Sequence, residues 1–153
     1  MTPSPYTGPG EGTELVAPDA VVTVKVAAAQ TTGAYEVFEI HAPRVPATPL
    51  HRTNWAKTYY VLSGRMLVHL EDEAYDLGPG AAVVIQPNAW HTFTVLSPST
   101  TFLVVSLTDA MGRFHADLDA TVPHGAPLSD SVDALAQVLS RHDVALKSPE
   151  LGP

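Results

Sequence analysis

The sequence contains no cysteine, few basic residues and no long hydrophobic run. Without cysteine there can be no disulfide framework, thiolate zinc site or thiol nucleophile. Only 8 of the 153 residues are Lys or Arg, against 16 Asp or Glu, and the basic residues form no cluster. A binder of nucleic acid or of a membrane surface would need such a cluster, so we expect neither as a partner.

Membrane insertion and secretion lack their usual signals as well. The longest apolar stretch, residues 20–29, is interrupted by Thr23 and Lys25 and is too short to span a bilayer. The first fifteen residues have neither the basic nor the apolar segment of a secretory signal. These features predict a cytoplasmic protein.

The composition is that of a folded domain. Apolar residues make up 45% of the chain and charged residues 16%, and the length suits one domain. Fourteen Pro and ten Gly divide the chain into short segments. Residues 1–13 are rich in Pro, Gly and Thr and predict a flexible N-terminal arm.

Residues 14–108 contain seven short segments that are rich in Val, Ile, Tyr, Phe and Thr and are separated by turn residues. So many short strands, with no helical segment between them, predict a mainly β domain, an antiparallel sandwich or barrel. The expected strands are Val21–Val26, Tyr35–His41, Thr58–Leu62, Met66–Leu70, Ala82–Ile85, Thr92–Leu96 and Phe102–Leu107.

Residues 109–153 change to a helical period. Apolar residues recur at helical spacing over residues 109–122, from Met111 to Val122, and again over residues 129–142, with Ser129 or Asp130 as N-cap. We predict two helices that pack on the outside of the barrel as a short C-terminal helical extension.

Two stretches, residues 49–64 and 80–95, resemble the two motifs of the cupin superfamily, G-x5-H-x-H-x3-E-x6-G and G-x5-P-x-G-x2-H-x3-N. The register fits without gaps at His51, Gly64, Gly80 and His91. The lead-in strands and the helical tail are similar to those of small quercetinase-like cupins. The resemblance implies a single cupin-type β-barrel, a double-stranded β-helix of jelly-roll topology, over residues 14–108.

The departures from these motifs concern the metal site. In the family two His, a Glu and a third His hold a divalent metal, whereas this chain has Thr53 at the second His position and Lys57 at the Glu position. A Lys cation repels a divalent ion, and zinc or iron needs more than two imidazoles. We therefore predict no metal cofactor. The alternative is a divalent metal at His51 and His91, completed by Glu36, Glu39, His41 or His69.

Strand parity predicts which residues share the pocket. If His51 faces the barrel interior, a period of two also turns Thr53, Trp55, Lys57 and Tyr59 inward, and from His91 it turns Phe93 inward. The turn before His91 is expected to place Trp90 at the rim. We predict His51, Lys57 and His91 as catalytic acid–base groups, and as substrate-binding residues Thr53, Trp55, Tyr59, Trp90 and Phe93. Packing or surface roles are expected for His69, His115, His124 and His142.

Three functions are compatible with these residues. The first, which we prefer, is a metal-independent enzyme of cyclase, isomerase or lyase type whose partner is a small-molecule substrate. The resemblance implies an aromatic or polyketide-like metabolite, and the Ala- and Pro-rich, Lys-poor composition is typical of bacteria with such pathways. The others are a metal-dependent cupin dioxygenase with a rebuilt ligand set and a non-catalytic small-molecule-binding cupin. A homodimer is also expected, because Val21–Val26 would leave an exposed sheet edge that a two-fold partner could cover.

Overall fold

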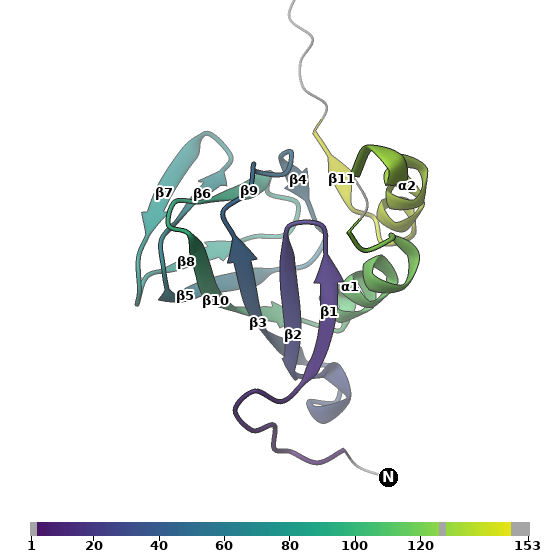
Figure 1. Cartoon of the computed structure of the whole chain (residues 1–153). Helices are drawn as coiled ribbons and strands as arrows, with labels where there is room; N and C mark the ends of the chain where they lie inside the picture. Colours follow the sequence, from purple (N-terminus) through teal and green to yellow (C-terminus); the bar gives the residue numbers. More distant parts are fainter. Residues whose placement is uncertain (1–2, 126–127, 148–153) are drawn as a thin grey trace, which may run out of the picture.

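The computed structural model describes residues 3–125 and 128–147, with no side-chain detail at residues 128 and 129. In these residues two antiparallel β-sheets face each other, and two α-helices lie along one side (Figure 1). The predicted mainly β fold with helices outside it is confirmed. None of the helices in this part of the chain combines the length and the apolar character needed to cross a membrane.

The larger sheet has six strands in the order β1-β2-β3-β10-β5-β8, and all neighbours are antiparallel. Strands far apart in sequence therefore pair at its centre, as in a jelly roll. Its strands are β1 (Thr13–Ala17), β2 (Ala20–Val26), β3 (Tyr35–Pro43), β10 (Ser99–Leu107), β5 (Lys57–Ser63) and β8 (Ala82–Ile85).

The smaller sheet has five strands in the order β11-β4-β9-β6-β7. They are β11 (Ala145–Leu146), β4 (His51–Arg52), β9 (His91–Val95), β6 (Met66–Leu70) and β7 (Glu73–Leu77). All seven strands expected from the sequence are present, and β1, β4, β7 and β11 are additional. Strands β4 and β11 have only two residues each, and β7 is mostly exposed, so neither length nor apolar alternation indicated them.

The C-terminal segment contains the two expected helices, α1 (Ala110–Thr121) and α2 (Val132–Arg141). Helix α2 begins later than expected because a short 3-10 helix, η2 (Leu128–Ser131), precedes it. A second 3-10 helix, η1 (Ala28–Gln30), follows β2. The Asp117 carboxylate on α1 accepts hydrogen bonds from the Arg141 guanidinium and from His142 Nε2, at 2.9 Å in each case. This cluster joins the two helices.

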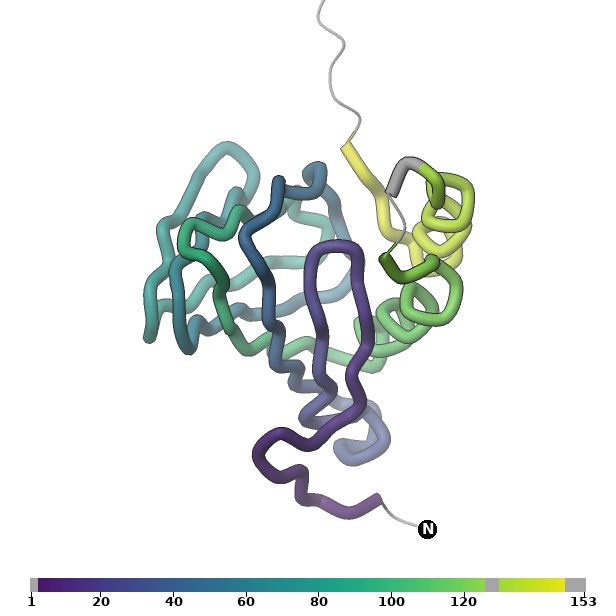
Figure 2. Tube along the Cα trace, viewed as in Figure 1, coloured from purple at the N-terminus to yellow at the C-terminus, as the bar shows by residue number. Residues whose placement is uncertain are grey.

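The hairpin of β1 and β2 lies beside α1 (Figure 2). Strand β2 is flanked by β1 and β3, so the expectation that Val21–Val26 is an exposed edge is wrong. The strand at this edge of the sheet is β1, and α1 covers part of it, since the Val16 amide donates a hydrogen bond to Asp119 Oδ1 at 2.9 Å. The segment that precedes β1 is held by Lys25 on β2, whose ammonium group donates hydrogen bonds to the carbonyls of Gly8 and Glu11, each at 2.8 Å.

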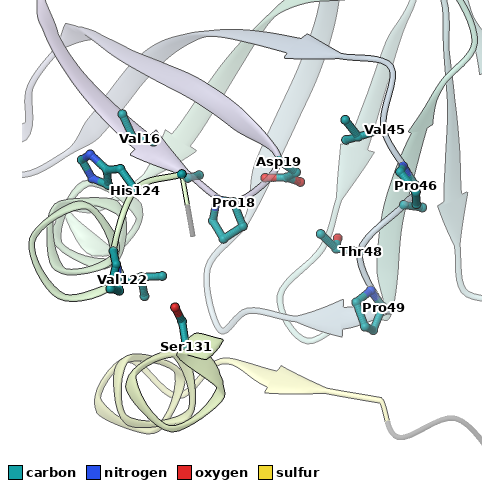
Figure 3. Close-up of a pocket in the computed structure, with 14 residues that line it drawn as sticks. Val16, Pro18, Asp19, Val45, Pro46, Thr48, Pro49, Val122, His124 and Ser131 are labelled. Atoms are coloured by element: carbon teal, nitrogen blue, oxygen red, sulfur yellow. The ribbon is translucent and has the colours of Figure 1, made fainter. Parts of the chain in front are cut away.

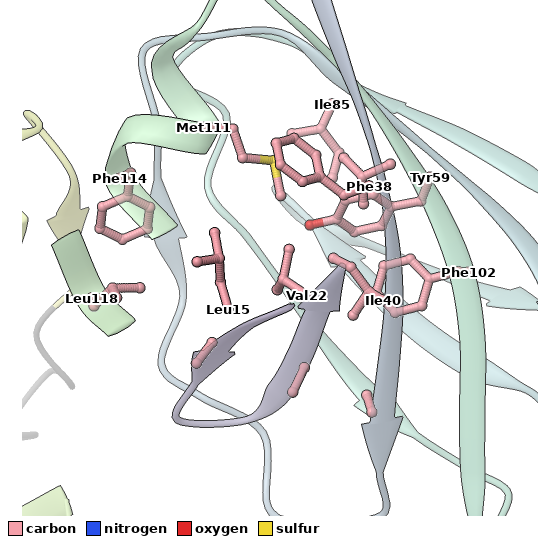
Figure 4. Close-up of a cluster of buried hydrophobic side chains, with 14 of the residues drawn as sticks. Leu15, Val22, Phe38, Ile40, Tyr59, Ile85, Phe102, Met111, Phe114 and Leu118 are labelled. Atoms are coloured by element: carbon pink, nitrogen blue, oxygen red, sulfur yellow. The ribbon is translucent and has the colours of Figure 1, made fainter. Parts of the chain in front are cut away.

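The core lies between the inward faces of the two sheets and the inner face of α1 (Figure 4). Side chains alternate between core and surface along β3, with Phe38 and Ile40 buried, and Phe102 on β10 packs on Tyr59 with ring centroids 5.1 Å apart. Met111, Phe114 and Leu118 of α1 complete the apolar wall. Next to this wall, the inward-facing positions before and on β5 hold the polar residues Thr53, Lys57 and Tyr59.

Candidate active site

A cavity of about 200 Å³ lies beneath the β1–β2 hairpin and is lined by both sheets and both α-helices. We call it the inner cavity. Most of its wall is apolar, including Val22, Ile40 and Phe93 from the sheets and Leu135 and Leu139 from α2. Against this wall stand a few polar side chains, which are Asp19, Thr48, His51, Thr53, Lys57, Tyr59 and His115. An apolar chamber with a small set of convergent polar groups is typical of a small-molecule site.

The alternation expected from the sequence is present in the segment from His51 to Tyr59. Every second residue lines the inner cavity, and Thr53, Trp55, Lys57 and Tyr59 are buried. Between them, Arg52 and Asn54 are exposed. The period of two therefore continues from β4 into β5, although the chain crosses from the small sheet to the large one between them.

His51 and His91 are register partners on β4 and β9, with ring centroids 4.4 Å apart. His51 Nδ1 lies 3.1 Å from the carbonyl of Pro49, and His91 Nδ1 lies 2.8 Å from the carbonyl of Ala89. Because a carbonyl oxygen only accepts, each Nδ1 carries the hydrogen and each Nε2 keeps a lone pair. Burial, with the Lys57 charge as the second cause, lowers the pKa of His51 to about 4 and also lowers the pKa of His91. Both rings are neutral at pH 7.

Lys57 reaches the inner cavity from β5 and is only 7% exposed. Its Nζ lies 5.5 Å from the centroid of the Tyr59 ring. Burial lowers the pKa of Lys57 to about 7, although the negative charge of Asp19 opposes that effect. Near pH 7 the amine is thus present in both protonated and neutral form, as an acid–base group requires.

Two polar residues of the cavity were not predicted as site residues. Asp19, in the turn between β1 and β2, is the sole carboxylate among the described lining residues, and burial raises its pKa. His115 on α1 was expected to be a packing or surface residue, but it lines the cavity, and burial lowers its pKa to about 3. Helical spacing could have indicated His115, which is four residues after Met111 and three before Leu118. No local signal marks Asp19, because its position depends on where the hairpin folds.

Of the remaining predicted site residues, some line the inner cavity and others do not. Phe93 lines the cavity and packs edge-on against Phe102, and the buried Trp55 Nε1 has no hydrogen-bond partner within the described ranges. His91 reaches the site through its contact with the His51 ring rather than by lining the cavity. Trp90 lies outside the cavity lining, with the Arg52 guanidinium 5.3 Å from the centroid of its ring. Phe93 is thus a cavity residue as predicted, whereas the predicted substrate-binding residue Trp90 does not line the inner cavity.

A second, larger cavity of about 480 Å³ adjoins the first (Figure 3). We call it the outer cavity. Val45 and Pro46 line one side of it, and Val122 and His124 lie on the other. The residues that line both cavities are Ala17, Pro18, Asp19, Thr48 and Pro49. Asp19 therefore stands where the two cavities meet.

The fold and the site together define a small antiparallel β-barrel protein with an apolar chamber that contains a few polar side chains. A family model described as "Cupin domain" matches residues 37–106, which include β3 to β10 apart from the last residue of β10 and the first two of β3. Over these residues the chain is similar to the cupin superfamily, and its fold is the cupin fold. A comparison with curated proteins found no match.

Solved structures with the same fold include KdgF from Halomonas sp., with a TM-score of 0.60, 21% identity, and coverage of 70% of this chain and 94% of that one. The polyketide cyclase RemF from Streptomyces resistomycificus has a TM-score of 0.58 and 22% identity, with coverage of 67% of this chain and 78% of that one. The DMSP lyase DddQ from Ruegeria pomeroyi has a TM-score of 0.53 and 17% identity, with coverage of 60% of this chain and 48% of that one. At these identities the likeness establishes the fold alone.

The residues present do not fit the metal site of the family. Lys57, a buried amine, occupies the position of the carboxylate ligand, and Thr53 occupies that of an imidazole ligand. Glu36 does not line the inner cavity, and its Oε1 accepts a hydrogen bond from the Gly112 amide at the start of α1, at 3.0 Å. The other candidate substitutes lie on outward-facing positions of β3 and β6, which are Glu39, His41 and His69. Within residues 3–125 and 128–147 no three His, Cys, Asp or Glu side chains gather as metal ligands would.

Proposed function

We propose that the protein is a metal-independent small-molecule enzyme of cyclase, isomerase or lyase type, acting on an aromatic or polyketide-like metabolite. One observation carries this proposal: the Lys57 amine is buried in the inner cavity, together with His51, at the position where the family has a metal-binding carboxylate. Burying an amine among apolar side chains disfavours folding unless the amine is used or paired.

Many reactions in this class begin with the loss of a proton next to a carbonyl group, and we propose such a step here. The lone pair of His51 Nε2 can accept that proton, and the Lys57 ammonium can stabilise the oxyanion that forms. Proton return from Lys57 to another atom would complete an isomerisation, a ring closure or an elimination. His91 holds the His51 ring from the side, so we assign it a positioning role.

The fold is compatible with such chemistry, since two structural neighbours are named as a polyketide cyclase and a DMSP lyase. A dioxygenase is less well supported, because it would need a metal and the ligand positions hold Thr53 and Lys57. A non-catalytic binding cupin would use the same apolar walls, but it would have no need of a lysine among them. Turnover decides between the enzyme and the binding protein.

The test is a screen of aromatic and polyketide-type carbonyl compounds, with turnover followed by mass spectrometry. The protein is purified without an affinity metal and assayed with and without a chelator. For a compound that is converted, we expect Lys57→Met to lower turnover by about 10²–10⁴, the usual contribution of a general acid–base group. Lys57→Arg should fail as well, because a guanidinium stays protonated.

Lys25→Met is the matched control, because Lys25 bonds backbone carbonyls away from both cavities, and it should keep full turnover. Full activity of Lys57→Met would show that Lys57 is not the acid–base group, whereas binding of these compounds without any turnover would favour the binding protein. Activity that a chelator abolishes and one particular divalent ion restores would favour the dioxygenase.

A further inference from the structure

We propose that Lys57 captures carbonyl compounds covalently, as an imine between its Nζ and the carbon of an aldehyde or ketone. The inference rests on the proposed function and narrows its substrates to molecules with a reactive carbonyl group at one end. It adds a covalent step to the acid–base role of Lys57, and the two roles can be tested separately.

The setting of the amine is the first argument. Lys57 Nζ has no hydrogen bond or ion pair with the described residues, whereas Lys25 Nζ is held by two carbonyls at 2.8 Å. The neighbours of Lys57 in the cavity include the rings of Tyr59, Trp55 and Phe93. An amine in apolar surroundings spends more time in the neutral form, which is the nucleophile. The low pKa of Lys57, about 7, agrees with this geometry.

Imine formation also needs groups that carry protons, and the inner cavity supplies them. Asp19 lies on the hairpin, His51 on β4 and His115 on α1, and all three line the cavity with Lys57 and Tyr59. In the outer cavity Asp19 also faces the wall that contains His124. Since Nδ1 of His51 bonds the Pro49 carbonyl, its Nε2 is free to accept a proton.

The step balances without any redox partner. The lone pair of Nζ attacks the carbonyl carbon, the π electrons move to oxygen, and one proton passes from nitrogen to oxygen through His51. Asp19 then protonates the hydroxyl group, which leaves as water while the nitrogen lone pair forms the C=N bond. The products are one protonated imine, one water and one carboxylate, and the carboxylate of Asp19 stabilises the positive imine.

The two cavities fit a substrate of this kind. The inner cavity, at about 200 Å³, has room for the carbonyl end of a molecule. The rest could extend past Asp19 into the outer cavity, where Val45 and Pro46 on one side and Val122 on the other offer apolar surface (Figure 3).

The experiment uses the whole protein and two probes, propionaldehyde with cyanoborohydride and acetylacetone without it. The chain has three lysines, Lys25, Lys57 and Lys147, so peptide mass spectrometry can assign every adduct. At pH 7 a lysine with a pKa near 7 has roughly a thousandfold larger neutral fraction than an ordinary lysine with a pKa near 10.4. We therefore expect labelling of Lys57 at least about tenfold faster than that of Lys25, whose Nζ is held by two carbonyls. The rate at Lys57 should level off above about pH 7.

The Asp19→Asn variant should slow adduct formation at Lys57 about tenfold or more, and Asp19→Glu should restore part of it. The matched control is Glu14→Gln, an exposed carboxylate on the same hairpin, and it should have no effect. Equal labelling of the three lysines, or none at Lys57, would overturn the inference, as would an Asp19→Asn rate equal to that of the parent protein.

Failure of this inference can be told apart from failure of the proposed function. If borohydride leaves turnover of a converted compound intact while Lys57→Met abolishes it, Lys57 acts by proton transfer alone and the imine is rejected. If borohydride inactivates the enzyme only while that compound is present, with the added mass on Lys57, the imine is supported.

Discussion

His51 and His91 make the same backbone contact, in which the ring Nδ1 bonds the carbonyl two residues earlier, at Pro49 and Ala89. The two rings lie 4.4 Å apart on paired strands, and both turn Nε2 away from these carbonyls. In a metal-binding cupin such nitrogens would serve as ligands, and in this chain they are neutral bases near a buried amine. The arrangement leads to predictions on stability as well as on activity.

Acid should destabilise the protein well above the range in which carboxylates titrate. His51 and His115 have pKa values of about 4 and 3 in the folded state, below the unfolded value of 6.5. The unfolded chain therefore binds more protons below pH 6.5, and the free energy of unfolding falls as pH decreases, by roughly 1.4 kcal/mol per pH unit for each such histidine. Urea unfolding between pH 7.5 and 4.5 measures the slope. His115→Leu should reduce this slope, and a slope equal to that of the parent protein would contradict the prediction.

Lys57→Met should stabilise the fold while it abolishes turnover. The folded pKa of Lys57, about 7, lies below its unfolded value of 10.5, so the penalty for burying the charge is complete below pH 7. The parent protein gains stability as pH rises from 7 to 10.5, and the variant does not share this gain. We expect an advantage for the variant on the order of 2 kcal/mol at pH 6.5, shrinking toward pH 10. Chemical denaturation at pH 6.5, 8 and 9.5 checks this, and a variant less stable than the parent at pH 6.5 would refute it.

Restoring the ligands of the family should restore metal binding. The double variant Thr53→His with Lys57→Glu places an imidazole and a carboxylate on inward-facing positions next to His51 and His91. Three imidazoles and one carboxylate can hold a divalent ion, whereas the parent set cannot. Isothermal calorimetry with Zn²⁺ and Mn²⁺ should detect one tight site in the double variant and only weak binding in the parent. Equal affinities would show that the alignment of residues 49–64 with the first cupin motif is wrong.

A homodimer remains a prediction, and the structure offers a different surface for it. The outer face of the six-stranded sheet exposes Tyr60, Val84, Val105 and Leu107, and their strands β5, β8 and β10 are neighbours. Several exposed apolar side chains on neighbouring strands are typical of an interaction surface. Light scattering should give twice the 16.2 kDa mass of the chain, and Tyr60→Lys should give the monomer mass. Tyr75→Lys on β7, similarly exposed on the other sheet, is the control, and a parent protein of 16.2 kDa would end the dimer prediction.

Much of the fold followed from local patterns. Strand segments rich in β-branched and aromatic residues were identified because side-chain alternation and turn residues are properties of short stretches of chain. The same alternation placed Thr53, Lys57 and Tyr59 on one face, and burial in the structure agrees with it. Strands β4 and β11 were missed because two residues contain no pattern, and they form only where partner strands are already in place.

The sequence by itself determined the β-barrel class, the inward face of the segment from His51 to Tyr59, and the absence of the usual metal ligands at Thr53 and Lys57. Only the tertiary structure decided that Asp19 and His115 join these residues, because a hairpin and a helix distant in sequence fold over the same cavity. It also decided that Val21–Val26 is an interior strand and that Glu36 bonds the start of α1. The physical reason is that periodicity fixes which way a side chain points from its own strand, whereas its neighbours across the cavity depend on how the separate elements pack.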